Sequence, residues 1–243
     1  MVKVIVNGAK GRMGSEAVNA INNDSALELV AECDFGDDLS ALIKSTGAQV
    51  VVDLTAASAG FSNTQLILNA GACPVIGTSG FQVEQVKELQ ALASEKQLGG
   101  LIAPNFSIGA VLMMKFSAEA AKYLPDAEVI EAHSPQKEES PSGTGIRTAE
   151  LISAARTKTP VECSDKELIE GARGAELNGV KLHSIRLPGV VAQQTVFFGG
   201  LSETLKIEHN SQHRESFMPG ICLACKEVVK RNELVYGLEY LMD

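Results

Sequence analysis

The chain has 243 residues, of which 45% are hydrophobic, and a formal net charge of −9 at pH 7. This length suffices for one large domain or two small ones, and no apolar run is long enough to span a membrane. The acidic charge argues against nucleic acids and acidic membrane surfaces as partners. The first residues, Met1-Val2-Lys3-Val4-Ile5-Val6, have the character of a buried strand and not of a signal peptide, so we expect a cytoplasmic protein.

Five cysteines, an odd number in a chain of this size, fit reduced thiols better than a disulfide framework. Cys222 and Cys225 have the Cys-x-x-Cys spacing of redox and zinc sites, but no second pair completes a zinc site. Both lie inside the apolar run Ile221–Val229. We therefore expect buried helix cysteines and no metal.

In chain order, the first hundred residues alternate strands with helices. Amphipathic segments such as Val83–Glu95 predict helices. Short apolar runs between them predict strands at Lys3–Val6, Leu27–Cys33, Gln49–Leu54, Pro74–Ile76 and Gly100–Ala103. Strands that are apolar on both faces and alternate with helices are typical of a parallel sheet covered on both sides. The sequence therefore predicts an α/β domain with a Rossmann-type, doubly wound parallel sheet.

A glycine-rich segment, Gly8-Ala9-Lys10-Gly11-Arg12-Met13-Gly14, follows the first strand and precedes a helix that runs to about Ile21. In this context, glycines permit a tight turn, let a pyrophosphate approach the backbone and allow close packing of helix on strand. The spacing is a variant of G-x-G-x-x-G. A glycine turn with a purely structural role is the alternative, but the strand before and the helix after favour a dinucleotide site.

The second predicted strand ends at an acidic residue, Asp34, about 20 residues beyond the glycine motif. A carboxylate at this place accepts hydrogen bonds from the ribose hydroxyls of NAD and repels the extra phosphate of NADP. Residues 35–38 include no arginine, although Lys10 and Arg12 can reach a 2′-phosphate. We expect NADH as the preferred cofactor, with NADPH tolerated.

Two later loops follow predicted strands of the same sheet. They are Gly77-Thr78-Ser79-Gly80 and Ala103-Pro104-Asn105-Phe106-Ser107. Ligands of such sheets bind outside the carboxyl ends of the strands, so we expect both loops to contact the nicotinamide side of the cofactor. The alternative is a pair of ordinary strand-to-helix turns.

From Glu128 onward the pattern changes. Strands are predicted at Lys181–Leu187, Val190–Phe198 and Glu203–His209, with short turns and no helices between them. Sequential strands imply antiparallel or mixed pairing, and hence a second α+β domain. A helix over Glu215–Lys230 returns to the first domain. We expect a dinucleotide-binding domain of residues 1–106 completed by 214–243, and a substrate-binding and oligomerisation domain of residues 107–213.

The segment Glu131–Gly145 has the strongest chemical character. A loop after a predicted strand carries the imidazole of His133 and the ammonium of Lys137, and it ends in Ser142-Gly143-Thr144, a helix-start signal. A helix N-terminus offers unpaired N–H groups and suits a phosphate or carboxylate. A proton donor, a cation and an anion cradle within a dozen residues favour a site for an anionic substrate over a solvated turn and a capped helix.

Together, these motifs resemble the dihydrodipicolinate reductase family. The resemblance covers the whole chain in order, and the His…Lys…Pro-Ser-Gly-Thr block is specific to the family. It implies NAD(P)H-dependent reduction of a cyclic dicarboxylate imine, 4-hydroxy-tetrahydrodipicolinate, to tetrahydrodipicolinate in the diaminopimelate route to lysine. Hydride would reach a ring carbon, and a positioned acid would protonate the resulting enamine.

The resemblance also implies a role for each matching residue. It implies His133 and Lys137 as the proton-donating pair, and Gly143 and Thr144 as binders of a substrate carboxylate. It implies cofactor contacts from three loops, namely Gly8, Ala9, Lys10, Gly11, Arg12 and Met13, then Gly77, Thr78 and Ser79, then Ala103, Pro104, Asn105 and Phe106. The family assembles homotetramers through its mixed-sheet domain, and we expect the same here.

Five positions depart from the family pattern. Leu54, Ser79 and Glu139 stand where Phe, Thr and Asp are usual, and the other two departures are at histidine positions. The family usually carries two adjacent histidines, and the second is Ser134 here; its hydroxyl still suits a substrate carboxylate but carries no charge. Gln193 stands where a histidine is expected. These departures leave open a reductase-like paralogue that acts on another small imine or keto acid, and a nucleotide-binding regulator without turnover. The intact pair His133 and Lys137 favours an enzyme over a regulator.

Overall fold

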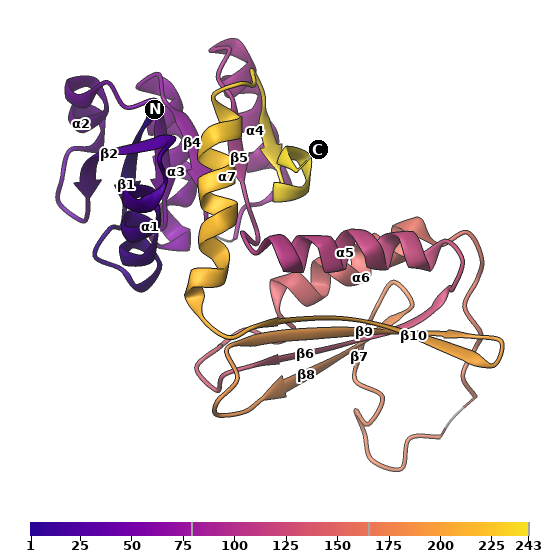
Figure 1. Ribbon diagram of the computed structural model, residues 1–243. Coiled ribbons are helices and arrows are strands. Elements are labelled where there is room, and N and C mark those ends of the chain that lie inside the picture. Colours follow the sequence, from indigo (N-terminus) through magenta and orange to yellow (C-terminus); the bar gives the residue numbers. More distant parts are fainter. Residues whose placement is uncertain (79, 165, 243) are drawn as a thin grey trace. The chain divides into compact units, whose positions relative to one another are not determined.

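A computed structural model describes residues 1–78, 80–164 and 166–242 (Figure 1). The chain divides into two compact units, one of Met1–Ile108 with Arg214–Asp243 and one of Gly109–His213. The two units therefore divide after Ile108 and after His213. In the part of the chain that the structure describes, no helix has the length and apolar character needed to cross a membrane.

The sheet of the first unit has six parallel strands, in the order β11-β5-β4-β3-β1-β2. The strands are β1 (Val2–Asn7), β2 (Leu27–Cys33), β3 (Val50–Asp53), β4 (Cys73–Ile76), β5 (Gly100–Ile102) and β11 (Leu234–Tyr236). The expected Rossmann-type sheet is confirmed. The sequence did not predict β11, which the C-terminal segment adds beside β5.

Helices cover both faces of this sheet. They are α1 (Arg12–Asn23), α2 (Leu39–Thr46), α3 (Ala57–Asn69), α4 (Val83–Glu95) and α7 (Met218–Val228), with short 3-10 helices η1 (Arg214–Phe217) and η2 (Leu238–Leu241). One core cluster joins strand residues such as Val51 to Ile43, Ile67 and Leu89 of α2, α3 and α4. The buried positions of one helix are four residues apart, as Leu39 and Ile43 are on α2 and Leu89 and Ala93 are on α4, so each helix buries one stripe against the sheet.

Helix α7 carries the Cys-x-x-Cys pair. Cys222 and Cys225 are both buried, as expected. Burial raises the pKa of both thiols, which keeps them protonated and poorly nucleophilic. The pair is therefore part of the core that packs α7 onto the sheet.

The sheet of the second unit has the order β10-β9-β6-β8-β7. Its strands are β6 (Asp126–His133), β7 (Ala175–Leu177), β8 (Val180–Arg186), β9 (Ala192–Gly200) and β10 (Glu203–Ser211). Strands β6 and β8 are parallel and the other pairs are antiparallel. The expected mixed sheet is confirmed, although β7 was not predicted.

Helices α5 (Ile108–Ala121) and α6 (Gly143–Ala155) lie along one face of this sheet (Figure 1). The core between them includes Val129, Ile152, Val196 and Phe198. Residues of β6 alternate, so that Val129 and Glu131 are buried on the helix side while Glu128 points to the opposite face. The prediction that β6 ends before His133 was wrong, because His133 still pairs with Ala192 of β9.

Candidate active site

The glycine loop joins β1 to α1 at the carboxyl edge of the parallel sheet, beside the point between β1 and β3 where the strand order reverses. Gly8 has a φ of +82°, and a Cβ there would lie 3.1 Å from the carbonyl carbon of Leu54. A Cβ on Gly14 would lie 2.0 Å from the carbonyl oxygen of Gly8. A side chain at either position would displace the backbone. The two glycines therefore let the loop pack tightly against Leu54 and against the start of α1.

Asp34 follows β2 and is tied to the glycine loop. Its carboxylate accepts hydrogen bonds from the backbone N–H of Phe35 at 2.8 Å and of Lys10 at 2.9 Å. These two backbone hydrogen bonds lower the pKa of Asp34. The group is thus an oriented carboxylate at the rim of the loop.

The loops after β3, β4 and β5 meet at the same edge of the sheet. A Cβ on Gly77 would lie 2.6 Å from Leu54 Cδ2 and 2.9 Å from Phe106 Cε2, so these three loops touch. The buried hydroxyl of Thr78 has no hydrogen-bond partner among the described residues. An unpartnered buried hydroxyl beside a glycine cradle fits a polar ligand that completes the site.

The other expected cofactor residues are placed as follows. Ala9, Ala103 and Phe106 are buried, whereas Lys10, Arg12 and Pro104 are exposed; Gly11, Met13 and Asn105 lie in the same loops. Ser79 lies outside the described residues. All of the described ones belong to the first unit, and the expected proton donor and substrate binders belong to the second.

In the second unit, the segment from His133 to Gly145 runs from the end of β6 to the first turn of α6. The N–H of Lys137 donates to the carbonyl oxygen of Ser134 at 3.1 Å, which closes a turn. Ser142 caps α6, since its Oγ accepts from the N–H of Gly145 at 3.1 Å. A Cβ on Gly143 would meet nothing within 4 Å, so the first turn of α6 faces open space there.

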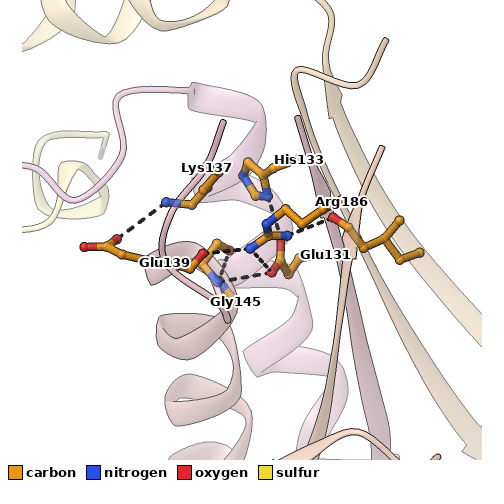
Figure 2. A network of polar contacts seen from close by, with 8 residues as sticks. Glu131, His133, Lys137, Glu139, Gly145 and Arg186 are labelled. Atoms are coloured by element: carbon orange, nitrogen blue, oxygen red, sulfur yellow. Dashed lines mark hydrogen bonds and ion pairs between the residues drawn. The ribbon is translucent and has the colours of Figure 1, made fainter. Parts of the chain in front are cut away.

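The carboxylate of Glu131 lies at the centre of this region (Figure 2). Its Oε2 lies 2.5 Å from Nδ1 of His133. Arg186 donates to both carboxylate oxygens at 3.0 Å, and the N–H of Ser142 donates to Oε1 at 3.2 Å. One carboxylate therefore holds the expected proton donor, a guanidinium from β8 and the start of α6.

Glu131 is fully buried. Burial by itself would raise the pKa of Glu131, but hydrogen bonds from the side chains of His133, Arg186 and Ser184 outweigh it and lower the pKa to about 2. The group is therefore an anion at neutral pH. A buried carboxylate is stable only when it is paired in this way.

The expected cation, Lys137, is held more loosely. Its ammonium lies 3.5 Å from Glu139 Oε2, and the Glu139 side chain is 74% exposed. Figure 2 shows the Lys137 side chain pointing toward Glu139, while one nitrogen of His133 points at Glu131. A pair with so exposed a carboxylate contributes little stability, so little energy holds the ammonium to Glu139.

Sequence reasoning missed Glu131 and Arg186. The signal for Glu131 was its position, because Ala127, Val129 and Glu131 alternate on the buried side of β6. A carboxylate at an inward position of a strand needs a partner. The position of Gln193, in contrast, lies away from this cluster, since Gln193 pairs with Ala132 on the opposite face of the sheet.

Two family models match the chain. "Dihydrodipicolinate reductase, N-terminus" matches residues 2–106 and "Dihydrodipicolinate reductase, C-terminus" matches residues 109–242. Among curated relatives, 4-hydroxy-tetrahydrodipicolinate reductase of Streptococcus gordonii is 49% identical over 253 residues. The enzyme of the same name from Legionella pneumophila is 50% identical over 240 residues. In both cases 99% of each chain is covered.

Solved structures agree with these matches. The dipicolinate-bound dihydrodipicolinate reductase of Paenisporosarcina sp. TG-14 superposes with a TM-score of 0.90 at 39% identity, over 100% of both chains. An amine dehydrogenase of Mycobacterium smegmatis, with a TM-score of 0.66 and 12% identity over 96% of this chain and 94% of its own, shares the fold alone. By its family models, its full-length relatives and this superposition, the chain belongs to the dihydrodipicolinate reductase family.

Proposed function

We propose that the chain reduces 4-hydroxy-tetrahydrodipicolinate to tetrahydrodipicolinate, and that His133 and Lys137 carry its protonation step. Relatives named for this reaction are about half identical over 99% of the chain, which confirms the expected enzyme class, an NAD(P)H-dependent oxidoreductase. The residue roles are our inference. The observation that carries them is the imidazole of His133, fixed by a buried carboxylate at the end of β6 beside the open start of α6.

The family uses a nicotinamide cofactor, and the first unit has the loops to hold one. When bound, the nicotinamide supplies the hydride. The glycine loop and the first turn of α1 would bind the pyrophosphate through backbone N–H groups. Thr78 and Phe106, which lie on loops that meet at Gly77, would face the nicotinamide end.

His133 would protonate the carbon next to the one that accepts hydride. An imidazole is the side chain best suited to exchange a proton near neutral pH. The ammonium of Lys137 would stabilise the negative charge that develops on the substrate before the proton arrives. Its weak, exposed pairing with Glu139 leaves it available for that role.

The first turn of α6 would bind a substrate carboxylate. N–H groups at a helix N-terminus, together with the helix dipole, favour an anion. Gly143 leaves open space at this turn, and Thr144 follows it. Ser134, at the other end of the loop, would donate its hydroxyl to a carboxylate.

We infer a preference for NADH from Asp34. Its carboxylate is oriented by the N–H groups of Lys10 and Phe35, and it would accept from ribose hydroxyls and repel a 2′-phosphate. Titration calorimetry should show NADH binding at least as tightly as NADPH. Asp34→Ala should weaken NADH selectively, while Glu32→Gln, which removes a nearby exposed carboxylate, should not; much tighter binding of NADPH to the wild type would contradict the preference.

The proposed activity is tested by giving the purified protein NADH and the product of dihydrodipicolinate synthase. We expect NADH oxidation that depends on that product. A paralogue with another substrate would oxidise no NADH in this assay, and a regulator would bind NADH without turnover. The variant Ser134→His further distinguishes the proposed reductase from a paralogue with another substrate. It should lower KM and leave kcat unchanged only if Ser134 binds a carboxylate of this substrate.

We also infer self-association, as a homotetramer, through the second unit. The sheet face opposite α6 presents the exposed apolar side chains Ile185 and Phe197, and exposed apolar side chains on an open sheet face favour burial against another copy. Light scattering at micromolar concentration should give four times the chain mass of 25.7 kDa. A monomeric mass would contradict the assembly.

A further inference from the structure

The hydrogen bond between Glu131 and His133 determines which nitrogen of the imidazole carries a hydrogen. Glu131 is fully buried and its pKa is lowered to about 2. An ionised carboxylate only accepts hydrogen bonds. The contact between Oε2 and Nδ1 at 2.5 Å therefore requires a hydrogen on Nδ1.

The other ring nitrogen of His133 is then the one that gains and loses a proton. In the neutral ring with Nδ1–H, Nε2 carries a lone pair, and in the imidazolium both nitrogens are donors. Figure 2 shows the edge of the ring with Nδ1 turned to Glu131 and the rest of the ring turned away. The proton that reaches the substrate must therefore leave from Nε2.

We propose that Glu131 and Arg186 are positioning residues, which fix His133 in the Nδ1–H form and balance each other in setting how firmly Nε2 holds its proton. The inference deepens the proposed function, since it rests on His133 being the proton donor. It goes beyond that function because it assigns a role to Glu131 and Arg186, which act on the donor through its ring orientation and charge and not as donors themselves.

The two members of the pair act on the imidazolium with opposite signs. The Glu131 carboxylate stabilises the imidazolium through the 2.5 Å contact. Arg186, which binds both oxygens of Glu131 at 3.0 Å, neutralises that carboxylate and limits the stabilisation. The loop itself carries three more charged side chains, Lys137, Glu138 and Glu139, of which Lys137 and Glu139 pair with each other.

A purely structural role of Glu131 and Arg186 predicts a different effect of their removal on the pH dependence of kcat. Glu131 also accepts from the N–H of Ser142, and Arg186 also donates to the carbonyl oxygen of Glu139 at 2.7 Å. If the pair only fastens the loop, removing either member loosens the same loop. Both variants would then lose activity without opposite changes in its pH dependence.

The experiment measures the pH profile of kcat for wild type, Glu131→Gln, Arg186→Met and the double variant. Removing the carboxylate should move the alkaline limb of the profile to lower pH by about one unit. Removing the guanidinium should move it to higher pH, and the double variant should lie between the two. Shifts of the same sign in both single variants, or no shift in either, would overturn the proposal.

A matched control is available on the same strand. Glu128 also binds an arginine and a histidine, on the opposite face of the sheet. Glu128→Gln should leave the pH profile of kcat unchanged. A shift as large as that of Glu131→Gln would mean that the effect is a general one of charge on β6, and would also overturn the proposal.

Nitrogen-15 NMR of the histidine-labelled wild type tests the hydrogen position without any variant that might fail to fold. The His133 signal, assigned by its loss in His133→Gln, should show Nδ1 protonated when the ring is neutral. A neutral ring protonated on Nε2 would overturn the inference and leave the proposed function standing. Wild-type turnover in His133→Gln would instead contradict the proposed function, whichever nitrogen carries the hydrogen.

Discussion

Strand β6 carries two glutamates, Glu128 and Glu131, that point to opposite faces of the sheet, and each binds one arginine and one histidine. Glu128 lies 2.5 Å from Arg173 Nη2 and 2.8 Å from His183 Nε2, with its side chain 36% exposed. Glu131 holds Arg186 and His133 with its side chain 0% exposed. The same three side-chain types therefore occur once around a partly exposed carboxylate and once around a fully buried one.

The comparison shows how burial of the carboxylate changes the energetic value of its contacts with charged groups. Around Glu128, water can replace a lost partner, so each contact is worth little. Around Glu131, no solvent replaces a partner, and each charge depends on the others. The histidines also differ in orientation, because His183 uses Nε2 for its glutamate and His133 uses Nδ1. Only the buried cluster leaves Nε2 of its histidine for chemistry.

The sharpest test of this contrast exchanges each histidine for glutamine. Because a positioned general acid contributes about 10²–10⁴-fold, His133→Gln should lower kcat by that factor and leave NADH binding nearly unchanged. His183→Gln should keep kcat near the wild-type value. Steady-state kinetics measures kcat, and calorimetry measures NADH binding. Equal losses of kcat in the two variants would contradict a catalytic role that belongs to His133 alone.

The lysines near each cluster give a second, smaller contrast. Lys137→Ala should lower kcat and raise KM about tenfold or more, since a hydrogen bond to a charged group is worth about 1.5–3 kcal/mol. Lys181, on the strand that carries His183 of the Glu128 cluster, pairs with Glu176 at 2.9 Å. Lys181→Ala should change neither kcat nor KM. A normal KM in Lys137→Ala would remove the ammonium from substrate binding.

The two glutamates should differ in their effect on stability. Glu131→Gln should lower the free energy of unfolding by about 3–5 kcal/mol, because it leaves the Arg186 charge without its buried partner. Glu128→Gln should lower it by about 1 kcal/mol or less, because that cluster is partly solvated. Urea denaturation of the two variants measures the difference, and similar values would show that burial does not separate the clusters.

The smallest expected effect is on the pH dependence of stability. The pKa of Glu131 is lowered from 4.5 to about 2 on folding, so its contribution is complete above the unfolded value and declines as pH falls toward about 2. The contribution at stake is about 3 kcal/mol. The stability difference between wild type and Glu131→Gln should therefore shrink between about pH 5 and pH 3. A difference that stays constant over this range would contradict the lowered pKa.

Elements with long, regular patterns could be predicted from the sequence. The bounds of β2 and of α4 were predicted to the residue, because seven and thirteen residues give a clear period. Strands β7 and β11 have three residues each and are mostly not buried, so they show neither a period nor the continuous apolar run that marks the equally short β5. Their place is set by pairing with β8 and β5, which is a tertiary effect.

The candidate site was predictable only in part, for a similar reason. His133, Lys137 and the start of α6 are close in sequence, so a local motif gathers them. Arg186 is 55 residues from Glu131 and joins the cluster through the parallel register of β6 and β8. Register between distant strands depends on which faces are buried, and a single sequence does not display it.

The three anchors of the loop after β6 have a consequence for how such an enzyme can diverge. Glu131 fastens His133 before the loop and the N–H of Ser142 after it, and Arg186 holds the carbonyl oxygen of Glu139 between them. Because both ends attach to one carboxylate, the residues around Lys137 in the span 134–138 can be replaced without moving either end, provided that Lys137 is kept. Substitutions in this short span can thus change the substrate preference while the imidazole of His133 keeps its position.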